Sequence, residues 1–162
     1  MSTQAMIGRF VDSKIEGRYH HFDGYPTGLG KELFKLAKEW GKERLMKVLI
    51  DDHPAGWSSI LEADWNLPPR HQKDLKCANC GRPRYAHMGA LRSEGSFPPE
   101  CYCHGDSQED PSLLTDPSQM EWAYIFMGHM MYVRRHGNLV EAVDLEGPEP
   151  NWQEIQDRVY NS

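Results

Sequence analysis

The stretch of residues 70–118 constrains the fold of this 162-residue chain more than any other feature. It is polar, rich in glycine and proline, and it holds all four cysteines of the chain. A loop of this length without regular structure is unusual inside a compact domain, because its backbone would be ordered without an apolar core. Clustered cysteines in a chain without a secretion signal more often bind metal than form disulfides. We therefore predict one domain over residues 1–162, in which 70–118 is an insertion held together by a metal ion.

Two of the cysteines have the spacing of a zinc site. Cys77 and Cys80 are separated by two residues, so both thiolates can reach one ion, and Gly81 lets the backbone turn tightly behind them. Zinc prefers four such ligands in a tetrahedron, and a complete set of protein ligands indicates a structural ion. The side chains that compete for the other two places are thiols and imidazoles: Cys101, which we expect to be the third ligand, and then His87, Cys103 and His104. The alternative is four reduced thiols without metal.

The region before the insertion predicts two strands and two helices. Residues 5–11 and 14–22 have the composition of strands, and residues 12–13 supply a polar turn between them. Apolar residues then recur at helical spacing over residues 31–50, and Gly41 should break this run into two helices. In the second strand neither alternating set of side chains is purely apolar, so the pattern does not say which face of the sheet meets the core.

The region after the insertion predicts three more strands and a short helix. The strands span residues 121–127, 130–136 and 139–145, and the helix begins near Pro150. This order of elements favours an α+β fold. We expect an antiparallel sheet of about five strands, with helices packed on one face and the zinc-stapled loop inserted between its two halves.

The turn between the second strand and the first helix gathers the side chains best suited to chemistry. His20, His21 and Asp23 are the catalytic candidates, because histidine can act as acid or base near neutral pH. The groups around them suit an anionic ligand at the start of a helix: Tyr19, Tyr25, Thr27, Gly28, Gly30 and Lys31. The glycine spacing does not match a phosphate-binding P-loop, however, and adjacent strand residues point to opposite faces. The alternative is a purely structural role in turning the chain and capping the helix.

The charge of the chain argues against several classes of partner. The formal net charge is −6, with nine basic and six acidic residues in 1–50 but nine and eighteen in 51–162. An acidic bulk disfavours non-specific nucleic-acid binding, which depends on neutralising phosphates. No apolar run approaches the roughly 20 residues that span a bilayer, and the N-terminus lacks the pattern of a signal peptide. We expect a cytoplasmic protein with no membrane partner.

Residues 18–30, Arg-Tyr-His-His-Phe-Asp-Gly-Tyr-Pro-Thr-Gly-Leu-Gly, resemble a group of small, uncharacterised phage and prophage proteins, many from actinobacterial hosts. These proteins share a His-(Trp/Phe)-Asp-Gly-Tyr-Pro turn soon after the first strands, and Phe22 stands here for their commoner tryptophan. Residues 48–57 and 101–105 look like parts of the longer members. The resemblance covers the first third of the chain well and the rest in patches. It implies a phage-related origin and carries over no catalytic residue.

Three functions are compatible with these features. The first is a non-enzymatic phage accessory protein in the host cytoplasm that binds a host protein or a small anionic or nucleotide ligand, with host defence as one target. The second is a small hydrolase or transferase that acts on a phosphorylated or nucleotide substrate through His20, His21 and Asp23. The third is a nucleic-acid-binding zinc protein that uses the basic and aromatic side chains of residues 82–92. The lack of a complete catalytic set in the sequence favours the first function, and the oligomeric state is left open.

Overall fold

One sheet of seven strands organises the part of the chain that the computed structural model describes, which is residues 3–53, 56–63, 65, 100–101 and 113–160. The strand order is β4-β3-β2-β1-β5-β6-β7. The strands are β1 (Ala5–Val11), β2 (Lys14–His20), β3 (Trp57–Ser59), β4 (Glu100–Cys101), β5 (Trp122–Met127), β6 (Met130–Arg135) and β7 (Asn138–Asp144). The helical elements are η1 (Pro26–Gly30), α1 (Lys31–Trp40), α2 (Lys42–Met46), η2 (Lys47–Asp51), η3 (Pro117–Gln119) and α4 (Trp152–Tyr160).

The α+β class is confirmed, and the sheet is mixed. The strands β1, β2, β5, β6 and β7 match the five predicted ranges to within two residues at each end. Three of the pairings are antiparallel as expected: β1 with β2, β5 with β6, and β6 with β7. The sheet is mostly antiparallel, as predicted, but β1 pairs with β5, and β2 with β3, in parallel. Parallel neighbours need a long crossover connection, and the helices that follow β2 form part of it.

The helices after β2 form as the apolar spacing predicts. Helix α1 buries Leu33, Phe34 and Leu36 in one apolar cluster with the sheet. Gly41 ends α1 with a φ of 85°, a backbone conformation that other residues rarely adopt, and α2 begins at the next residue. The predicted break at Gly41 is therefore confirmed. None of the helices in the described ranges is long and apolar enough to cross a bilayer.

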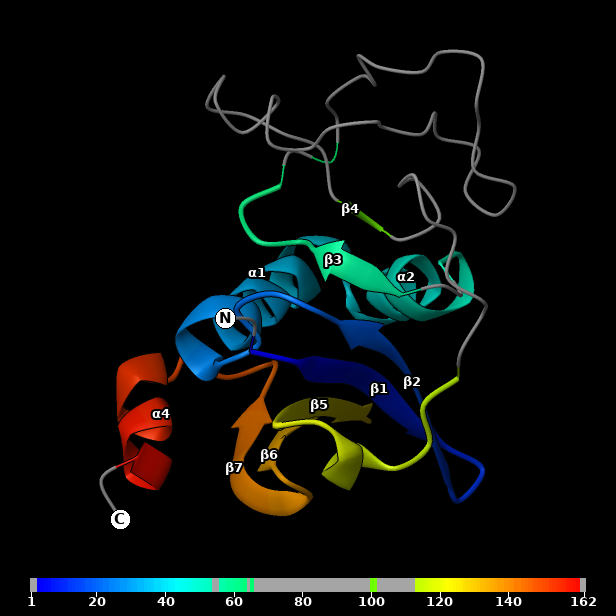
Figure 1. Cartoon of the computed structure of the whole chain (residues 1–162). Helices are drawn as coiled ribbons and strands as arrows, with labels where there is room; N and C mark the ends of the chain where they lie inside the picture. The colour runs from blue at the N-terminus through cyan, green and yellow to red at the C-terminus, as the bar shows by residue number, and fades with distance from the viewer. Residues whose placement is uncertain (1–2, 54–55, 64, 66–99, 102–112, 161–162) are drawn as a thin grey trace, which may run out of the picture.

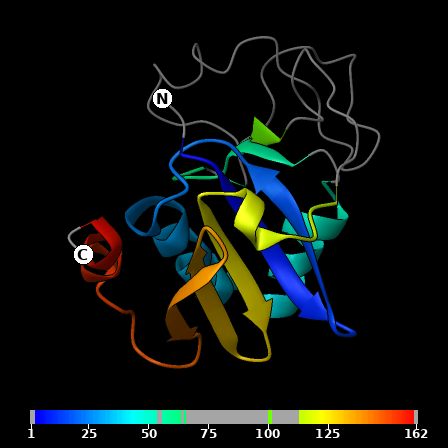
Figure 2. The ribbon, with the colours of Figure 1, turned by 60° about the horizontal axis from the view of Figure 1, so that its bottom comes forward.

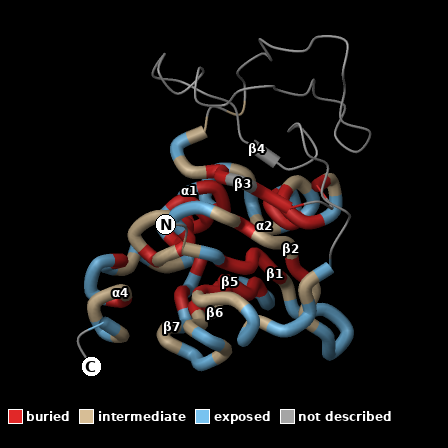
Figure 3. The backbone as a smooth tube through the Cα atoms, viewed as in Figure 1, coloured by how far each residue is buried: buried red, intermediate tan, exposed pale blue. Residues whose placement is uncertain are grey.

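Helices α1 and α2 lie on the same side of the sheet, whereas α4 lies beside β7 (Figure 1). We call the side toward α1 and α2 the helix-covered face. Its side chains on β5, Tyr124 and Phe126, are buried in the main apolar cluster. Figure 3 shows that buried positions concentrate where the central strands meet these helices. The core predicted from the helical spacing is therefore formed on this face.

The opposite side, here the helix-free face, has a smaller apolar cluster. Successive side chains of a strand point to opposite faces, and on this face Met6, Ala123 and Ile125 are buried. Leu114 and Met120 pack against these three residues. In Figure 2 the segment around η3 lies in front of the strands, with α1 and α2 behind them. The cover of this face is thus a short stretch of chain instead of a helix.

The described end of the predicted insertion is tied to the sheet edge. Leu114 forms an antiparallel β-bridge with Gly17 of β2, in which the amide of each residue donates to the carbonyl of the other at 2.8 Å. The rest of residues 70–118, apart from residues 100–101 and 113–118, lies outside the described part of the chain. The stapled insertion therefore stays a prediction.

Candidate functional site

The turn that holds His20, His21 and Asp23, here called the His-Asp turn, is anchored on the sheet by backbone hydrogen bonds. The amide of Gly24 donates to the carbonyl of Thr3 at 2.9 Å, and the carbonyl of Gly24 accepts from the buried hydroxyl of Tyr124 at 2.6 Å. The carbonyl of Asp23 accepts from the amide of Leu29 at 3.0 Å. This bond joins the turn to η1, the first helical segment after β2. A Cβ atom at Gly24 would lie 2.7 Å from the carbonyl oxygen of Thr3, so only glycine fits here without a backbone shift.

His20 is a fully buried group that points toward the helix-covered face. Its Nε2 accepts a hydrogen bond from the backbone amide of Ile60 at 3.1 Å, so the ring is neutral with its proton on Nδ1. Burial, reinforced by the charge of neighbouring His21, lowers the pKa of His20 to about 3, and the backbone of Phe22 opposes this only in part. A neutral imidazole without exposed surface fits a structural tie better than an exchangeable acid or base.

His21 lies just past the end of β2 and is partly exposed. Its Nδ1 and the hydroxyl of Tyr19 are 2.5 Å apart, and its ring meets Phe22 edge-on at 4.5 Å between centroids. Burial raises the pKa of Tyr19, and a hydrogen bond with Gln4 works against this. The structure therefore brings Tyr19 and His21 together, while His20 points into the core.

The other predicted groups near Asp23 bond to partners within the fold. The amide and the hydroxyl of Thr27 both donate to Oε1 of Gln156 on α4, at 3.1 and 2.8 Å. The hydroxyl of Tyr25 donates to Oδ1 of Asp23 at 3.1 Å. The amide and hydroxyl expected to receive an anion are thus satisfied by a side chain of the C-terminal helix.

The two glycines of the predicted ligand site permit close packing. A Cβ atom on Gly28 would lie 2.5 Å from the carbonyl oxygen of Asp23, and one on Gly30 would meet the ring of Tyr124 at 3.1 Å. Lys31 begins α1 and is exposed. Ligand binding by these residues stays a prediction, and the contacts observed here are those of a helix docked on a sheet.

The predicted zinc ligands fall almost wholly outside the described residues. These are Cys77, Cys80, His87, Cys103 and the alternative His104. Cys101 belongs to β4, and its backbone pairs with that of Trp57 in β3. The zinc site is therefore neither supported nor contradicted by the described residues.

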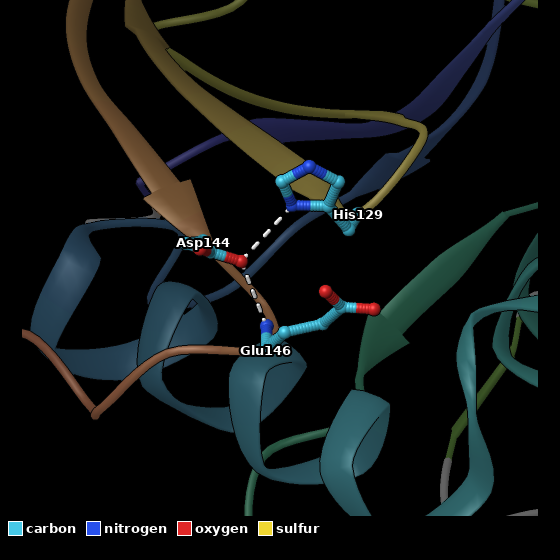
Figure 4. Close-up of side chains that lie close together, drawn as sticks. All are labelled: His129, Asp144 and Glu146. Carbon is cyan, nitrogen blue, oxygen red and sulfur yellow. Dashed lines mark hydrogen bonds and ion pairs between the residues drawn. The ribbon is translucent and has the colours of Figure 1, made fainter.

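A different group of potential metal ligands forms at the β5–β6 turn and the end of β7. The ligand atoms of His129, Asp144 and Glu146 lie within 4.8 Å of one another (Figure 4). Nδ1 of His129 is 3.0 Å from Oδ1 of Asp144, and that oxygen accepts from the backbone amide of Glu146 at 2.9 Å. This amide, followed by His129, lowers the pKa of Asp144. All three side chains are exposed, and turn geometry explains their arrangement without an ion.

The helix-free face also carries an apolar groove of about 400 Å³, which we call the sheet-face groove. Its lining comes from four strands: Phe10, Ile15, Ile125, Met127, Tyr132 and Arg134. Phe10 and Met127 are each 41% exposed, which is high for large apolar side chains. Phe10 also borders a second hollow of about 350 Å³ that reaches toward α2. The exposed side chains therefore form a continuous patch at one end of the sheet.

Arg134 is the charged member of the sheet-face groove. Its Nη1 donates to the carbonyl of Gly137 at 2.9 Å, and its Nε is buried without a hydrogen-bond partner. Among the described residues no carboxylate pairs with it, whereas Arg9 is bonded to Asp51 at 2.7 Å. No local pattern in the sequence indicates this groove, because strand alternation alone does not reveal which face a helix covers.

Comparisons with known proteins add no family to this picture. The chain matches no protein-family model, no curated protein and no solved structure.

Proposed function

We propose that this chain is a non-enzymatic accessory protein that binds a partner protein through the sheet-face groove. The observation that carries the proposal is an apolar groove with two exposed large side chains, Phe10 and Met127, beside an arginine without a carboxylate partner among the described residues. Protein interfaces favour such aromatic, methionine and arginine side chains.

The groove indicates the chemistry of its occupant. Its apolar walls suit an apolar side chain, and the guanidinium of Arg134 suits a carboxylate, which it can bind with charge-assisted hydrogen bonds. We therefore propose an apolar segment that carries an Asp or Glu side chain. In the phage-related interpretation of the sequence, the partner is a protein of the host cytoplasm.

Binding by the face of the sheet is favoured over strand addition at its β7 edge. Arg158 of α4 donates from Nη1 to the carbonyl of Val140 at 2.9 Å and also bonds to Glu141 at 3.2 Å. A strand that paired with β7 would have to displace this side chain. The sheet-face groove has no such obstruction among the described residues.

The contacts of the His-Asp turn also support binding over catalysis. His20 is buried and neutral, and the amide and hydroxyl of Thr27 are both bonded to Gln156. Among the described residues of the turn, the exposed groups are thus not arranged as a nucleophile, a base and an anion site. The hydrolase and nucleic-acid hypotheses remain predictions that no described contact favours.

Selection from a random peptide library tests the proposal with a defined probe. We expect enrichment of peptides that combine apolar residues with Asp or Glu. Phe10→Ser and Arg134→Gln should each weaken the binding of the selected peptide at least about tenfold, as expected for residues at the centre of an interface. Leu139→Ser is the matched control, because Leu139 is 55% exposed but does not line the groove.

Two outcomes would overturn the proposal. One is that no peptide is enriched, or that the enriched peptides bind Phe10→Ser as well as the native chain. The other is that a small apolar carboxylate such as decanoate binds in the groove while no peptide does. The first result removes the groove as a binding site, and the second changes the class of its ligand.

We also propose the structural zinc ion, which rests on the sequence spacing alone. Metal analysis of the purified chain should find one zinc ion, lost in Cys77→Ser and Cys80→Ser. A comparison of His87→Ala with Cys103→Ser would then identify the fourth ligand. A native chain that purifies folded and free of zinc, with supplied zinc in the medium, would rule out the site.

A further inference from the structure

Strand β3 is attached to the long strands by few backbone contacts. It pairs with β2 at one register position, Trp57 opposite His20, whereas β1 and β2 pair at seven. The amide of His21 donates to the carbonyl of Trp57 at 3.0 Å. Next to this short ladder, the backbone amide of Ile60 donates to Nε2 of His20 at 3.1 Å and ties the residue after β3 to β2. Trp57 also donates from Nε1 to the carbonyl of Leu49 at 3.0 Å, so the His20–Ile60 bond is the contact of this segment that depends on an imidazole acceptor.

The chemistry of this bond makes it sensitive to acid. Nε2 of His20 accepts the amide proton of Ile60 through the lone pair that a proton would occupy. Protonated imidazole has two N–H donors and no acceptor, so the amide of Ile60 would then face a donor. The amide of the next residue, Leu61, is bonded to Oγ of Ser59 at 3.2 Å and does not depend on His20. Protonation and the His20–Ile60 bond therefore exclude each other.

The surroundings of His20 offer no compensation for a positive charge. A charge on His21 disfavours protonation of His20, and Arg18 shares the helix-covered side of β2 two residues away. The ring of His53 contacts that of Trp57 at 4.2 Å between centroids, with the two ring planes tilted by 40°. Among the described residues no carboxylate favours the protonated ring. A buried histidinium without a counter-ion is strongly destabilising. Local opening of the segment around His20 would return the charged ring to water and remove this penalty.

We propose that the His20–Ile60 hydrogen bond is an acid-sensitive tie: as the pH falls, protonation of His20 releases Ile60 and β3 from β2 while β1, β5, β6 and β7 stay paired. This goes beyond the proposed function and does not depend on it. Release would expose Trp57, which is fully buried in the closed form. The attachment of β3 to β2, on the side of the sheet away from β7, would thus depend on pH.

The linkage fixes both the direction and the size of the effect. The pKa of His20 is about 3 in the closed form, and in an open form it returns toward its ordinary value of 6.5. The tie is therefore fully present above pH 6.5 and is lost as the pH falls toward 3. Opening should become roughly 50- to 100-fold more favourable between pH 7 and pH 4.5.

Amide hydrogen exchange of the full chain at pH 7 and pH 4.5 tests this directly. After correction for intrinsic exchange, the protection factor of the Ile60 amide should fall by roughly 50- to 100-fold and should stay well below that of Ile125 in β5, whose exchange requires the central strands to open. His20→Gln can still accept from Ile60 but does not titrate, so its Ile60 protection should be the same at both pH values. His21→Gln removes a neighbour that disfavours protonation of His20, so its Ile60 protection should still fall with pH, but by less than in the native chain.

Each remaining result contradicts the proposal. If the protection factor of Ile60 in the native chain is the same at both pH values, the proposed tie does not exist. If it falls equally in His20→Gln, a group other than His20 causes the fall. If His20→Gln does not fold, the ring of His20 is followed by NMR in the native chain instead. Titration of that ring near pH 6.5 with Ile60 still protected would show that the closed form tolerates the charge.

Discussion

The two faces of the same sheet differ in how completely they are buried. Phe126, on the helix-covered face, is 1% exposed, whereas its neighbour Met127, on the helix-free face, is 41% exposed. Helices α1 and α2 cover one face, and the short segment around Leu114 and Met120 covers only part of the other. The apolar residues of one strand thus serve stability on one side and remain available for binding on the other.

The largest expected effect is on the helix-covered face. Phe126→Ala should lower the free energy of unfolding by about 3–5 kcal/mol, because it leaves a cavity in the main core. Met127→Ala, one residue along the strand, should lower it by less than about 1 kcal/mol. Urea denaturation of both variants measures the difference. Equal losses would mean that the helix-free face is as tightly packed as the other, and the comparison would fail.

A second test uses the pH dependence of stability. The lowered pKa of His20 means that its contribution is present above pH 6.5 and is lost on acidification, by about 2 kcal/mol at pH 5. The raised pKa of Glu32, caused by burial, acts in the opposite direction, so the useful quantity is the difference in slope between native chain and His20→Gln. Urea denaturation from pH 7 to pH 5 gives both slopes. Identical slopes would show that His20 does not contribute.

A third test compares two tyrosines on neighbouring strands. Tyr124→Phe removes the hydroxyl that donates to the carbonyl of Gly24 in the buried turn, and should cost about 1 kcal/mol. Tyr132→Phe, in the sheet-face groove, should change stability by less than about 0.5 kcal/mol. Thermal unfolding of the two variants measures the pair. A loss at Tyr132 as large as that at Tyr124 would indicate a buried bond where we expect an open surface.

The smallest expected effect concerns two exposed residues of the helix-free face. Phe10→Ser and Leu139→Ser should each change the free energy of unfolding by less than about 1 kcal/mol, because both side chains are already substantially exposed. They should differ in peptide binding alone, since only Phe10 lines the groove. Chemical denaturation gives the first quantity and peptide titration the second. A large destabilisation by Phe10→Ser would assign this residue to the core instead of a binding surface.

Local patterns in the sequence predicted most of the regular elements. Strand composition located five of the seven strands, and Gly41 marked the break between α1 and α2. The three-residue strand β3 is too short to give a period, and the parallel pairing of β1 with β5 depends on contacts between residues more than 100 positions apart. Neither feature has a local signal.

The candidate site was harder to predict because its contacts are equally non-local. Adjacency in the sequence suggested that His20 and His21 belong to one site, but the strand directs His20 into the core. Thr27 meets Gln156 across 129 positions, and His129 meets Asp144 only through the register of β6 and β7. No pattern within a short window of the sequence contains these pairs.

The most direct test of the account is an NMR titration of the chain with a selected peptide that carries apolar and acidic residues. We expect chemical-shift changes at Phe10, Ile15, Met127 and Arg134, with little change in α1 and α2. Shifts centred instead on residues 23–31 would place the ligand at the His-Asp turn and contradict binding by the helix-free face.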